Sequence, residues 1–305
     1  MFTIIATGGN LAVTSPDGIV WTVQTPPSAP YGWKYVAGNA DTVVAIGINS
    51  SAAASFTGGV WTSRTLPVSA NWSGFAWNGS VFCAVAGGSD IAVTSPDGVT
   101  WTQRTLPFSS SWTSLAAKSG VFCSMEYYAS WVATPSTGIT SPDGITWTTR
   151  TIPLQAGFTT VRSNSTLFFA LPDNTTQAIT SPDGVTWTQQ TLPVTGSWNA
   201  AAGNDTILVA FNYGTNTSIT SPDGVTWTQR TLPISGGWRN IAWGGNVFCA
   251  VADDVAGVLV SSDGITWTQQ TLPVNPLTAG TFWMDVAWSA SASAFWTNFR
   301  RCYEL

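Results

Sequence analysis

The sequence contains no histidine and only two glutamates, Glu126 and Glu304. Without histidine, a Ser-His-Asp triad, a His–Cys pair and the usual zinc ligand sets are excluded. A hydrolase with paired carboxylates would need Glu126 to meet an aspartate from elsewhere in the chain, and nothing in the spacing indicates that. We therefore expect no enzyme activity, no cofactor and no bound metal.

Charge is scarce as well, since charged residues make up 8% of the chain and the net charge is −5. The basic residues stand singly, apart from the pair Arg300 and Arg301, so no basic stripe exists that could neutralise phosphates. We expect no nucleic-acid partner. The polar surface must instead come from Ser, Thr, Asn, Gln and Gly, which makes it neutral and rich in hydrogen-bonding groups.

Long apolar runs are missing. The first ten residues, MFTIIATGGN, carry no basic segment and no long apolar core, so they predict a strand rather than a signal peptide. The longest apolar runs are far shorter than the roughly 20 residues of a membrane-spanning helix. We expect neither a signal peptide nor insertion into a membrane.

Cysteine is also rare, with four residues in the chain. Cys83, Cys123 and Cys249 each end the same string, VFC, and Cys302 stands alone near the C-terminus. Equivalent positions in separate repeats are not expected to come within disulfide reach. We expect four free thiols, as in a protein that folds in a reducing cytosol.

What the sequence does contain is a repeat of about forty residues. The string SPDG-x-x-WT begins at Ser15, Ser95, Ser141, Ser181 and Ser221, and the variant SSDGITW begins at Ser261. A degraded copy, SFTGGVW, has Thr57 in place of the aspartate. The tryptophans that close these strings are 40 residues apart, except for one gap of 46; they are Trp21, Trp61, Trp101, Trp147, Trp187, Trp227 and Trp267.

Each repeat holds four short apolar segments, A to D, separated by turn residues. Four strands in about forty residues are typical of a propeller blade. The seven copies predict an all-β, seven-bladed β-propeller of four-stranded antiparallel blades, as one domain over residues 1–305. We number the blades from the N-terminus, so blade 1 contains Trp21.

The ends of the chain predict how the ring closes. Residues 1–18 align without gaps to residues 81–98, so the chain begins at strand B, and residues 283–289 supply the missing strand A. Strands from the N- and C-terminal ends then share blade 1 and remove exposed sheet edges. Residues 294–299 resemble a further B strand, which leaves open whether 1–8 or 294–299 closes the ring. The segment 295–305 is either an extra strand or a docking tail, through which the protein could form a homo-oligomer.

Turn chemistry explains every residue of the SPDG string. Pro fixes φ, Asp accepts hydrogen bonds from nearby backbone amides, Gly adopts a positive φ, and the following Trp packs between blades. A ring of aspartates could resemble a metal or catalytic set, but identical residues in each blade indicate scaffolding. The aspartates are Asp17, Asp97, Asp143, Asp183, Asp223 and Asp263.

The string S-P-D-G-x-x-W resembles the Asp-box of BNR-type β-propellers, S-x-D-x-G-x-x-W, shortened by one residue between Asp and Gly. As a repeat, the resemblance covers nearly the whole chain. In Asp-box families the box is a structural hairpin on the face opposite the active site. The shortened form resembles repeats in propeller proteins of tailed-phage genomes, often among tail and virion genes. The resemblance implies a virion protein made in the host cytoplasm, with other virion or tail proteins or a cell-surface glycan as partners.

The resemblance also makes a sialidase an alternative. Members of that family need three arginines that bind the substrate carboxylate, a Tyr–Glu pair and an aspartate, all near the axis. Most arginines of this chain do not fit, because they lie three residues after the blade tryptophan, on outer strand D; these are Arg64, Arg104, Arg150 and Arg230. Only Arg162 and Arg239 fall in predicted A strands. A sialidase-like glycoside hydrolase is therefore the weakest of the alternatives.

The repeats differ most in the connections from strand B to strand C, which share one face with the D-to-A loops. The longest, in blade 4, accounts for the gap of 46 residues and holds Glu126, Tyr127, Tyr128 and Trp131. Aromatic loop residues predict a sugar-stacking or protein-docking surface, or else a local core beneath the loop. We expect a non-enzymatic binding or structural propeller, most simply a tailed-phage virion or tail-associated protein acting in adhesion, decoration or assembly. The alternative is a stand-alone carbohydrate-binding lectin.

Overall fold

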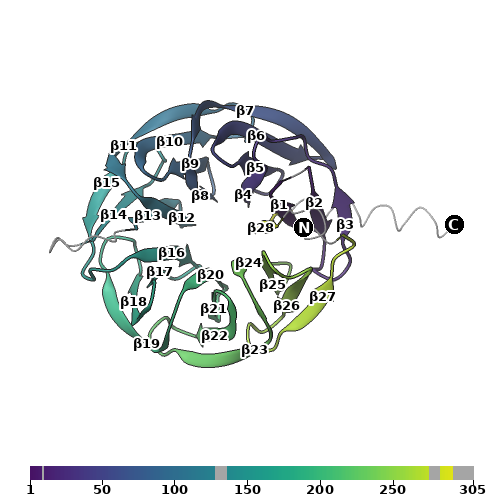
Figure 1. The fold of residues 1–305 in the computed structure, drawn as a ribbon. Coiled ribbons are helices and arrows are strands. Elements are labelled where there is room, and N and C mark those ends of the chain that lie inside the picture. Colours follow the sequence, from purple (N-terminus) through teal and green to yellow (C-terminus); the bar gives the residue numbers. More distant parts are fainter. Residues whose placement is uncertain (9, 128–135, 275–281, 291–305) are drawn as a thin grey trace.

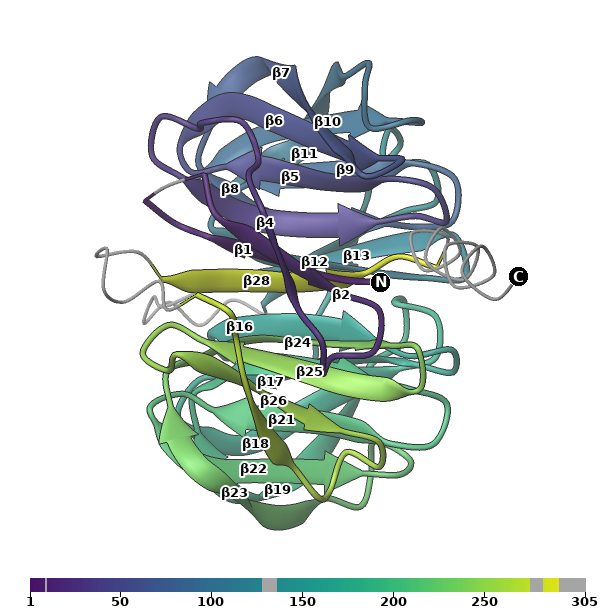
Figure 2. The same ribbon diagram turned by 90° about the vertical axis from the view of Figure 1, so that its right-hand side faces the viewer.

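A computed structural model describes residues 1–8, 10–127, 136–274 and 282–290. These residues form seven four-stranded antiparallel sheets arranged as blades around a central axis (Figure 1). The predicted all-β, seven-bladed propeller is confirmed. The side view in Figure 2 shows that the strands nearest the axis cross from one face of the disc to the other.

The A strands lie nearest the axis, and six of the seven begin with Trp. They are β28 (Trp283–Trp288), β4 (Trp33–Gly38), β8 (Trp72–Trp77), β12 (Trp112–Lys118), β16 (Phe158–Ser163), β20 (Trp198–Gly203) and β24 (Trp238–Gly244). The B strands are rich in Val, Phe, Leu and Ala and are almost wholly buried, as expected of strands covered on both faces. They are β1 (Phe2–Ala6), β5 (Val43–Gly47), β9 (Phe82–Ala86), β13 (Val121–Glu126), β17 (Phe168–Pro172), β21 (Leu208–Asn212) and β25 (Val247–Ala252).

Six of the seven C strands end in the Ser that starts the SPDG or SSDG string, and β6 continues two residues past the equivalent Ser55. They are β2 (Ala12–Ser15), β6 (Ser50–Thr57), β10 (Ser89–Ser95), β14 (Thr137–Ser141), β18 (Thr175–Ser181), β22 (Thr215–Ser221) and β26 (Gly257–Ser261). The D strands form the outer rim and are mostly exposed. They are β3 (Thr22–Gln24), β7 (Val60–Ala70), β11 (Thr102–Ser110), β15 (Thr148–Thr151), β19 (Thr188–Gly196), β23 (Thr228–Gly236) and β27 (Thr268–Thr271).

The ring closes in blade 1, where β1 pairs with both β28 and β2. Phe2 faces Trp288 on one side and Ser15 on the other, so the N-terminal strand occupies the B position. The backbone amide of Ser289 donates to the Met1 carbonyl over 3.0 Å and extends this pairing. Closure by N- and C-terminal strands is confirmed. Residues 294–299 and the whole segment 295–305 lie outside the described residues.

The hydrophobic core lies between blades rather than inside one blade. Each of seven apolar clusters contains buried side chains from two neighbouring blades. Trp21, which is 8% exposed, packs with Val258 and Val260 of blade 7. The repeated tryptophan therefore joins a blade to the one before it, where its large apolar area contributes most to stability.

The SPDG turn is held by its own side chains. In blade 1, the amides of Ile19 and Val20 donate to Asp17 Oδ1 over 2.8 and 2.9 Å, and the Gly18 amide donates to Ser15 Oγ over 2.8 Å. The same pattern recurs in the other five SPDG or SSDG turns. In blade 3, Gly98 has a φ of +74°, and a Cβ there would lie 2.4 Å from a Val44 methyl in blade 2. Glycine is therefore required both by the turn and by the neighbouring blade.

Three of the four cysteines are described, and they are free and buried: Cys83, Cys123 and Cys249. Burial raises the pKa of all three thiols, that of Cys123 to about 12. Cys302 lies outside the described residues. Over the part of the chain that the structure describes, no helix is long and apolar enough to cross a membrane.

Candidate functional site

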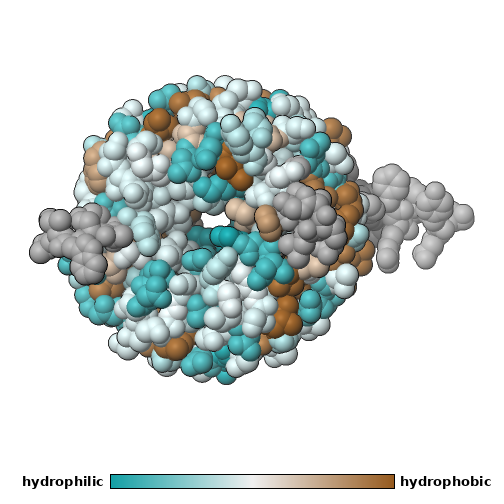
Figure 3. Space-filling model, in the orientation of Figure 1, coloured by the Kyte–Doolittle hydropathy of each residue, from teal (hydrophilic) through white to brown (hydrophobic). Residues whose placement is uncertain are grey.

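The seven A strands surround a central cavity of about 430 Å³. Figure 3 shows its opening at the centre of the face, with hydrophilic residues along part of its border. Most of the lining side chains are small and uncharged, such as Ser73, Thr113 and Asn199. Three of the residues that line the cavity are charged: Arg162, Arg239 and Asp285.

The third residue of an A strand lies over the backbone of the next blade. An A strand has no sheet partner on its inner edge, so its amides need other acceptors. Ser114 Oγ in β12 accepts the Val161 amide hydrogen of β16 over 2.7 Å. At the same position in β8, a Cβ on Gly74 would come 2.5 Å from the Leu115 amide nitrogen of β12. A polar side chain at this position can thus connect two blades.

Asp285 occupies this position in β28 and accepts hydrogen bonds from three donors. The Val36 amide of β4 donates to Oδ2 over 2.8 Å, and the Val286 amide donates to Oδ1 over 2.9 Å. Asn240 Nδ2, from β24, also donates to Oδ1. Burial, which leaves the residue 5% exposed, raises the pKa of the Asp285 carboxyl to about 6 although all these donors favour the charged form.

Arg162 reaches the same network from β16, further round the ring. Its Nη2 donates to Asn240 Oδ1 over 3.1 Å, and its Nη1 donates to the carbonyl of Val161 over 2.9 Å. Asn240 is therefore hydrogen-bonded to both the guanidinium and Asp285. Loss of water around this half-buried group lowers the pKa of the Arg162 guanidinium. Among the described residues, Arg162 forms no ion pair.

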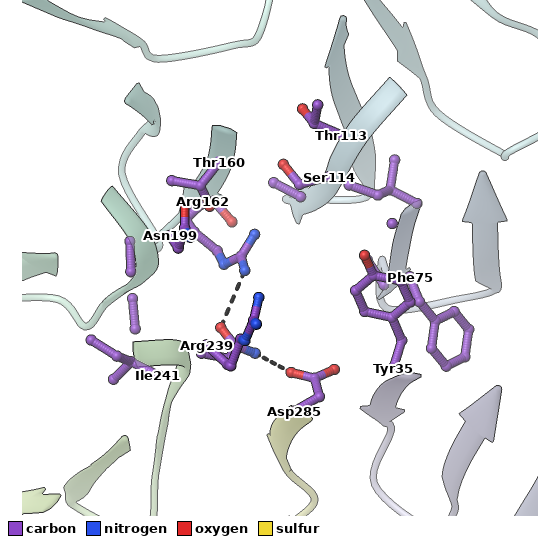
Figure 4. A pocket seen from close by; sticks show the side chains of 18 of the residues that line it. Tyr35, Phe75, Thr113, Ser114, Thr160, Arg162, Asn199, Arg239, Ile241 and Asp285 are labelled. Atoms are coloured by element: carbon purple, nitrogen blue, oxygen red, sulfur yellow. Dashed lines mark hydrogen bonds between the residues drawn. The ribbon is translucent and has the colours of Figure 1, made fainter. Parts of the chain in front are cut away.

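Tyr35 faces this network from β4 on the other side of the cavity (Figure 4). Its hydroxyl makes no hydrogen bond with a described residue. Burial, and the charge of Asp285 after it, raises the pKa of the Tyr35 hydroxyl, so the phenol keeps its proton and can donate it in a hydrogen bond. The cavity thus offers one guanidinium and one phenol as unsatisfied donors.

A second polar cluster joins Arg239, near the start of β24, to residues in the B-to-C connections of blades 6 and 7. Arg239 Nε donates to Asp253 Oδ2 over 2.7 Å, and the two groups form an ion pair. The guanidinium also lies over the ring of Tyr213, 5.1 Å from its centre, and the Tyr213 hydroxyl donates to Asp253 over 3.3 Å. Tyr213 is 37% exposed, so an aromatic ring and a charged pair stand together on this face.

The predicted binding loop of blade 4 is described only at its two ends. Glu126 Oε2 accepts the Ser110 hydroxyl and Oε1 accepts the Thr137 amide, both over 2.8 Å, so this carboxylate holds the two ends of the loop together. Tyr127 is 39% exposed and pairs with Gly157 through an isolated bridge. Tyr128 and Trp131 lie outside the described residues. The binding role of these four residues stays a prediction.

The repeated aspartates do not converge on the cavity. They lie in the C-to-D turns, which open on the face opposite the B-to-C connections, and backbone and serine hydrogen bonds lower the pKa of all six despite some desolvation. The arginines of the D strands bond to the neighbouring C strand instead, as Arg104 Nε does to Thr94 Oγ1 over 3.0 Å. Neither set faces the axis. Among the described residues, no three His, Cys, Asp or Glu side chains form a group that could hold a metal ion.

The network of Arg162, Asn240, Asp285 and Tyr35 was not predicted from the sequence, although a signal was present. The third position of the other A strands is uncharged: it carries Gly, Ser, Thr or Ala in four of them, Tyr35 in β4 and Asn240 in β24. Asp285 is the only acidic residue in the described A strands. A single charge, with a tyrosine and an asparagine, at a repeat position that otherwise holds small residues marks a break in the scaffold.

No family model matches the chain, and no curated protein matches it by sequence. Solved structures do resemble it. Virginiamycin B lyase from Staphylococcus aureus superposes with a TM-score of 0.69 at 10% identity, over 90% of each chain. Apo AztD from Citrobacter koseri gives a TM-score of 0.63 at 10% identity, covering 94% of this chain and 97% of that one. YCF48 bound to D1 peptide gives 0.56 at 15% identity, covering 80% and 86%. At these identities the likenesses show the propeller fold alone, and they supply no link to phage virions.

Proposed function

We propose that this chain is a non-catalytic binding propeller that presents its variable B-to-C face to a partner. The observation that carries the proposal is the contrast between the two faces. On the C-to-D face, turn aspartates are used by their own backbone in six blades. On the B-to-C face, Tyr127 and Tyr213 are exposed aromatic residues in connections that differ between blades. Exposed tyrosines among polar groups are typical of binding surfaces.

The state of the one carboxylate in the cavity lining supports a role without catalysis. A glycoside hydrolase of the common type needs two carboxyl groups about 5–10 Å apart, one of them free to move a proton. Asp285 has no second carboxylate beside it in the described cavity lining, and three donors occupy its oxygens. Its contacts are those of a group that joins blades.

The setting we propose is the virion of a tailed phage, where the chain would act in adhesion, decoration or assembly. The support is the SPDG-x-x-W repeat and its resemblance to virion propellers, together with a neutral surface rich in Ser, Thr and Asn. Mass spectrometry of purified particles from a phage that encodes the chain tests this setting. Recovery of the chain in a fixed ratio to the major tail proteins is expected, and its absence from washed particles would refute the virion role.

A stand-alone lectin is the second candidate, and the Tyr213 cluster favours it. Sugar sites combine an aromatic face with charged hydrogen-bonding groups, as Tyr213, Arg239 and Asp253 do here. A glycan array probed with the purified chain separates the candidates. Binding that Tyr213→Ala abolishes and Val225→Ala preserves would support the lectin, because Val225 is the more exposed of the two but lies in a C-to-D turn. If the chain binds no glycan on the array, the lectin is refuted and the virion role is the one candidate left.

A further inference from the structure

The central cavity is suited by size to a small molecule. At about 430 Å³ it falls within the range of small-molecule sites in proteins, roughly 300–1,000 Å³. Its lining combines apolar side chains, among them Phe75, Leu115 and Ile241, with the polar residues of the network (Figure 4). None of these groups belongs to the binding face proposed above, so the proposed function does not explain the cavity.

The guanidinium of Arg162 has hydrogen-bonding capacity that the described residues do not use. Arginine carries five N–H hydrogens, and the bonds to Val161 and Asn240 occupy only one on each Nη. Its positive charge meets the neutral amide of Asn240 rather than a carboxylate. A half-buried cation without a direct counter-ion is costly, and an anion in the cavity would relieve that cost.

The remaining charges near Arg162 do not supply such an anion. Arg239 is paired with Asp253. The Asp285 carboxylate is separated from the guanidinium by Asn240 and already accepts two backbone amides. Across the cavity stands the Tyr35 hydroxyl, a neutral donor. One cation without a carboxylate partner and one phenol around a cavity match an oxygen-rich anion, because a guanidinium can bind two oxygens of a carboxylate or phosphate at once.

We propose that the central channel binds a small oxyanion, held by Arg162 with the Tyr35 hydroxyl as a second donor. The ligand is either a small organic carboxylate, whose body would contact the apolar lining, or free inorganic phosphate or sulfate. Both share the oxygen chemistry that the guanidinium recognises. The site is distinct from the partner surface on the B-to-C face, so the two proposals can fail separately.

Isothermal titration of the purified chain tests this proposal, in a buffer free of oxyanions. The probes are benzoate with benzyl alcohol as its neutral match, and phosphate and sulfate as inorganic anions. We expect at least one anion to bind and benzyl alcohol not to bind. Preference for benzoate would identify an organic acid, and preference for phosphate or sulfate an inorganic anion. Failure of all three anions to bind up to tens of millimolar would overturn the proposal.

Variants at the two proposed donors test where the anion binds. Arg162→Gln should weaken binding about tenfold or more, and Arg162→Lys should weaken it less, because lysine keeps the charge but loses the paired donors. Tyr35→Phe removes one donor without changing the shape of the wall and should weaken binding by several-fold. Arg150→Gln is the matched control, since Arg150 bonds to Thr140 on the outer rim. Unchanged binding in folded Arg162→Gln and Tyr35→Phe variants, or equal loss in Arg150→Gln, would refute the site.

Discussion

The carboxylate of Asp285 accepts the backbone amide hydrogen of Val36 over 2.8 Å, and this bond crosses from the closing blade to blade 2. The same carboxylate is bonded to Asn240 of blade 7. One side chain therefore ties the blade made from both ends of the chain to its two neighbours. Such contacts help to hold the ring closed, because β1 and β28 come from opposite ends of the chain.

We expect Asp285→Ala to lower the free energy of unfolding by about 1–3 kcal/mol, because it leaves a buried amide and the Asn240 side chain without an acceptor. Urea unfolding followed by tryptophan fluorescence measures the effect. Asp41→Ala is the control, since Asp41 is exposed in an A-to-B turn and should change stability by less than about 0.5 kcal/mol. Equal stability of the Asp285 variant and the wild type would show that the contact contributes nothing to closure.

The pH dependence of stability should also carry the signature of Asp285. Its pKa is about 6 in the folded chain and 3.8 ordinarily, so between these values the native state holds a proton that the unfolded state has lost. Its contribution to stability therefore falls as the pH rises from about 4 to 6. Asp285→Asn lacks this titration, so subtracting its stability curve from that of the wild type should isolate the decline. A flat difference across the window would contradict the raised pKa.

The turn aspartates should act in the opposite direction and at lower pH. Their carboxylates have lowered pKa values in the folded chain, so their stabilising effect is present above about 4 and is lost as the pH falls further. Asp183→Ala should cost roughly 1–2 kcal/mol near neutral pH by removing the acceptor for the Val185 and Thr186 amides. Ligand or partner binding should survive. Loss of binding with unchanged stability would make the aspartate ring functional.

Thiol titration checks the cysteine prediction. The unfolded chain, kept under non-reducing conditions, should react at four thiols. In the native protein Cys83, Cys123 and Cys249 should stay unreactive near neutral pH, because burial blocks access and keeps the thiols protonated. Two or fewer reactive thiols in the unfolded chain would reveal a disulfide.

The sequence was sufficient to predict the blades, their number and the closure. Each repeat carries its own turn chemistry and inter-blade tryptophan, so local pattern and global fold agree, as Asp17 and Trp21 illustrate. The channel network was missed because it depends on where the third A-strand residue lies relative to the next blade. Arg162 and Asp285 are far apart in the sequence, and no repeat pattern indicates that they meet. The position of Glu126 was predicted, but its bonds across the blade 4 loop were not.

The B-to-C face is central to the proposed function, because the partner would bind there. Replacing residues 128–135 with a short Gly-Ser link tests it and leaves the Glu126–Thr137 contact in place. Loop changes of this kind cost little closure entropy, so the propeller should remain folded by circular dichroism and urea unfolding. Val185→Ser in a C-to-D turn is the control, since Val185 is exposed on the opposite face.

The deciding measurement compares how the wild type, the shortened protein and Val185→Ser bind to phage particles that lack this chain and to the glycan array. The wild type and Val185→Ser should bind equally, and the shortened protein should bind at least about tenfold more weakly, because tyrosine and tryptophan dominate binding surfaces. If the folded, shortened protein binds as well as the wild type while Val185→Ser does not, the partner surface lies on the C-to-D face and the account is wrong.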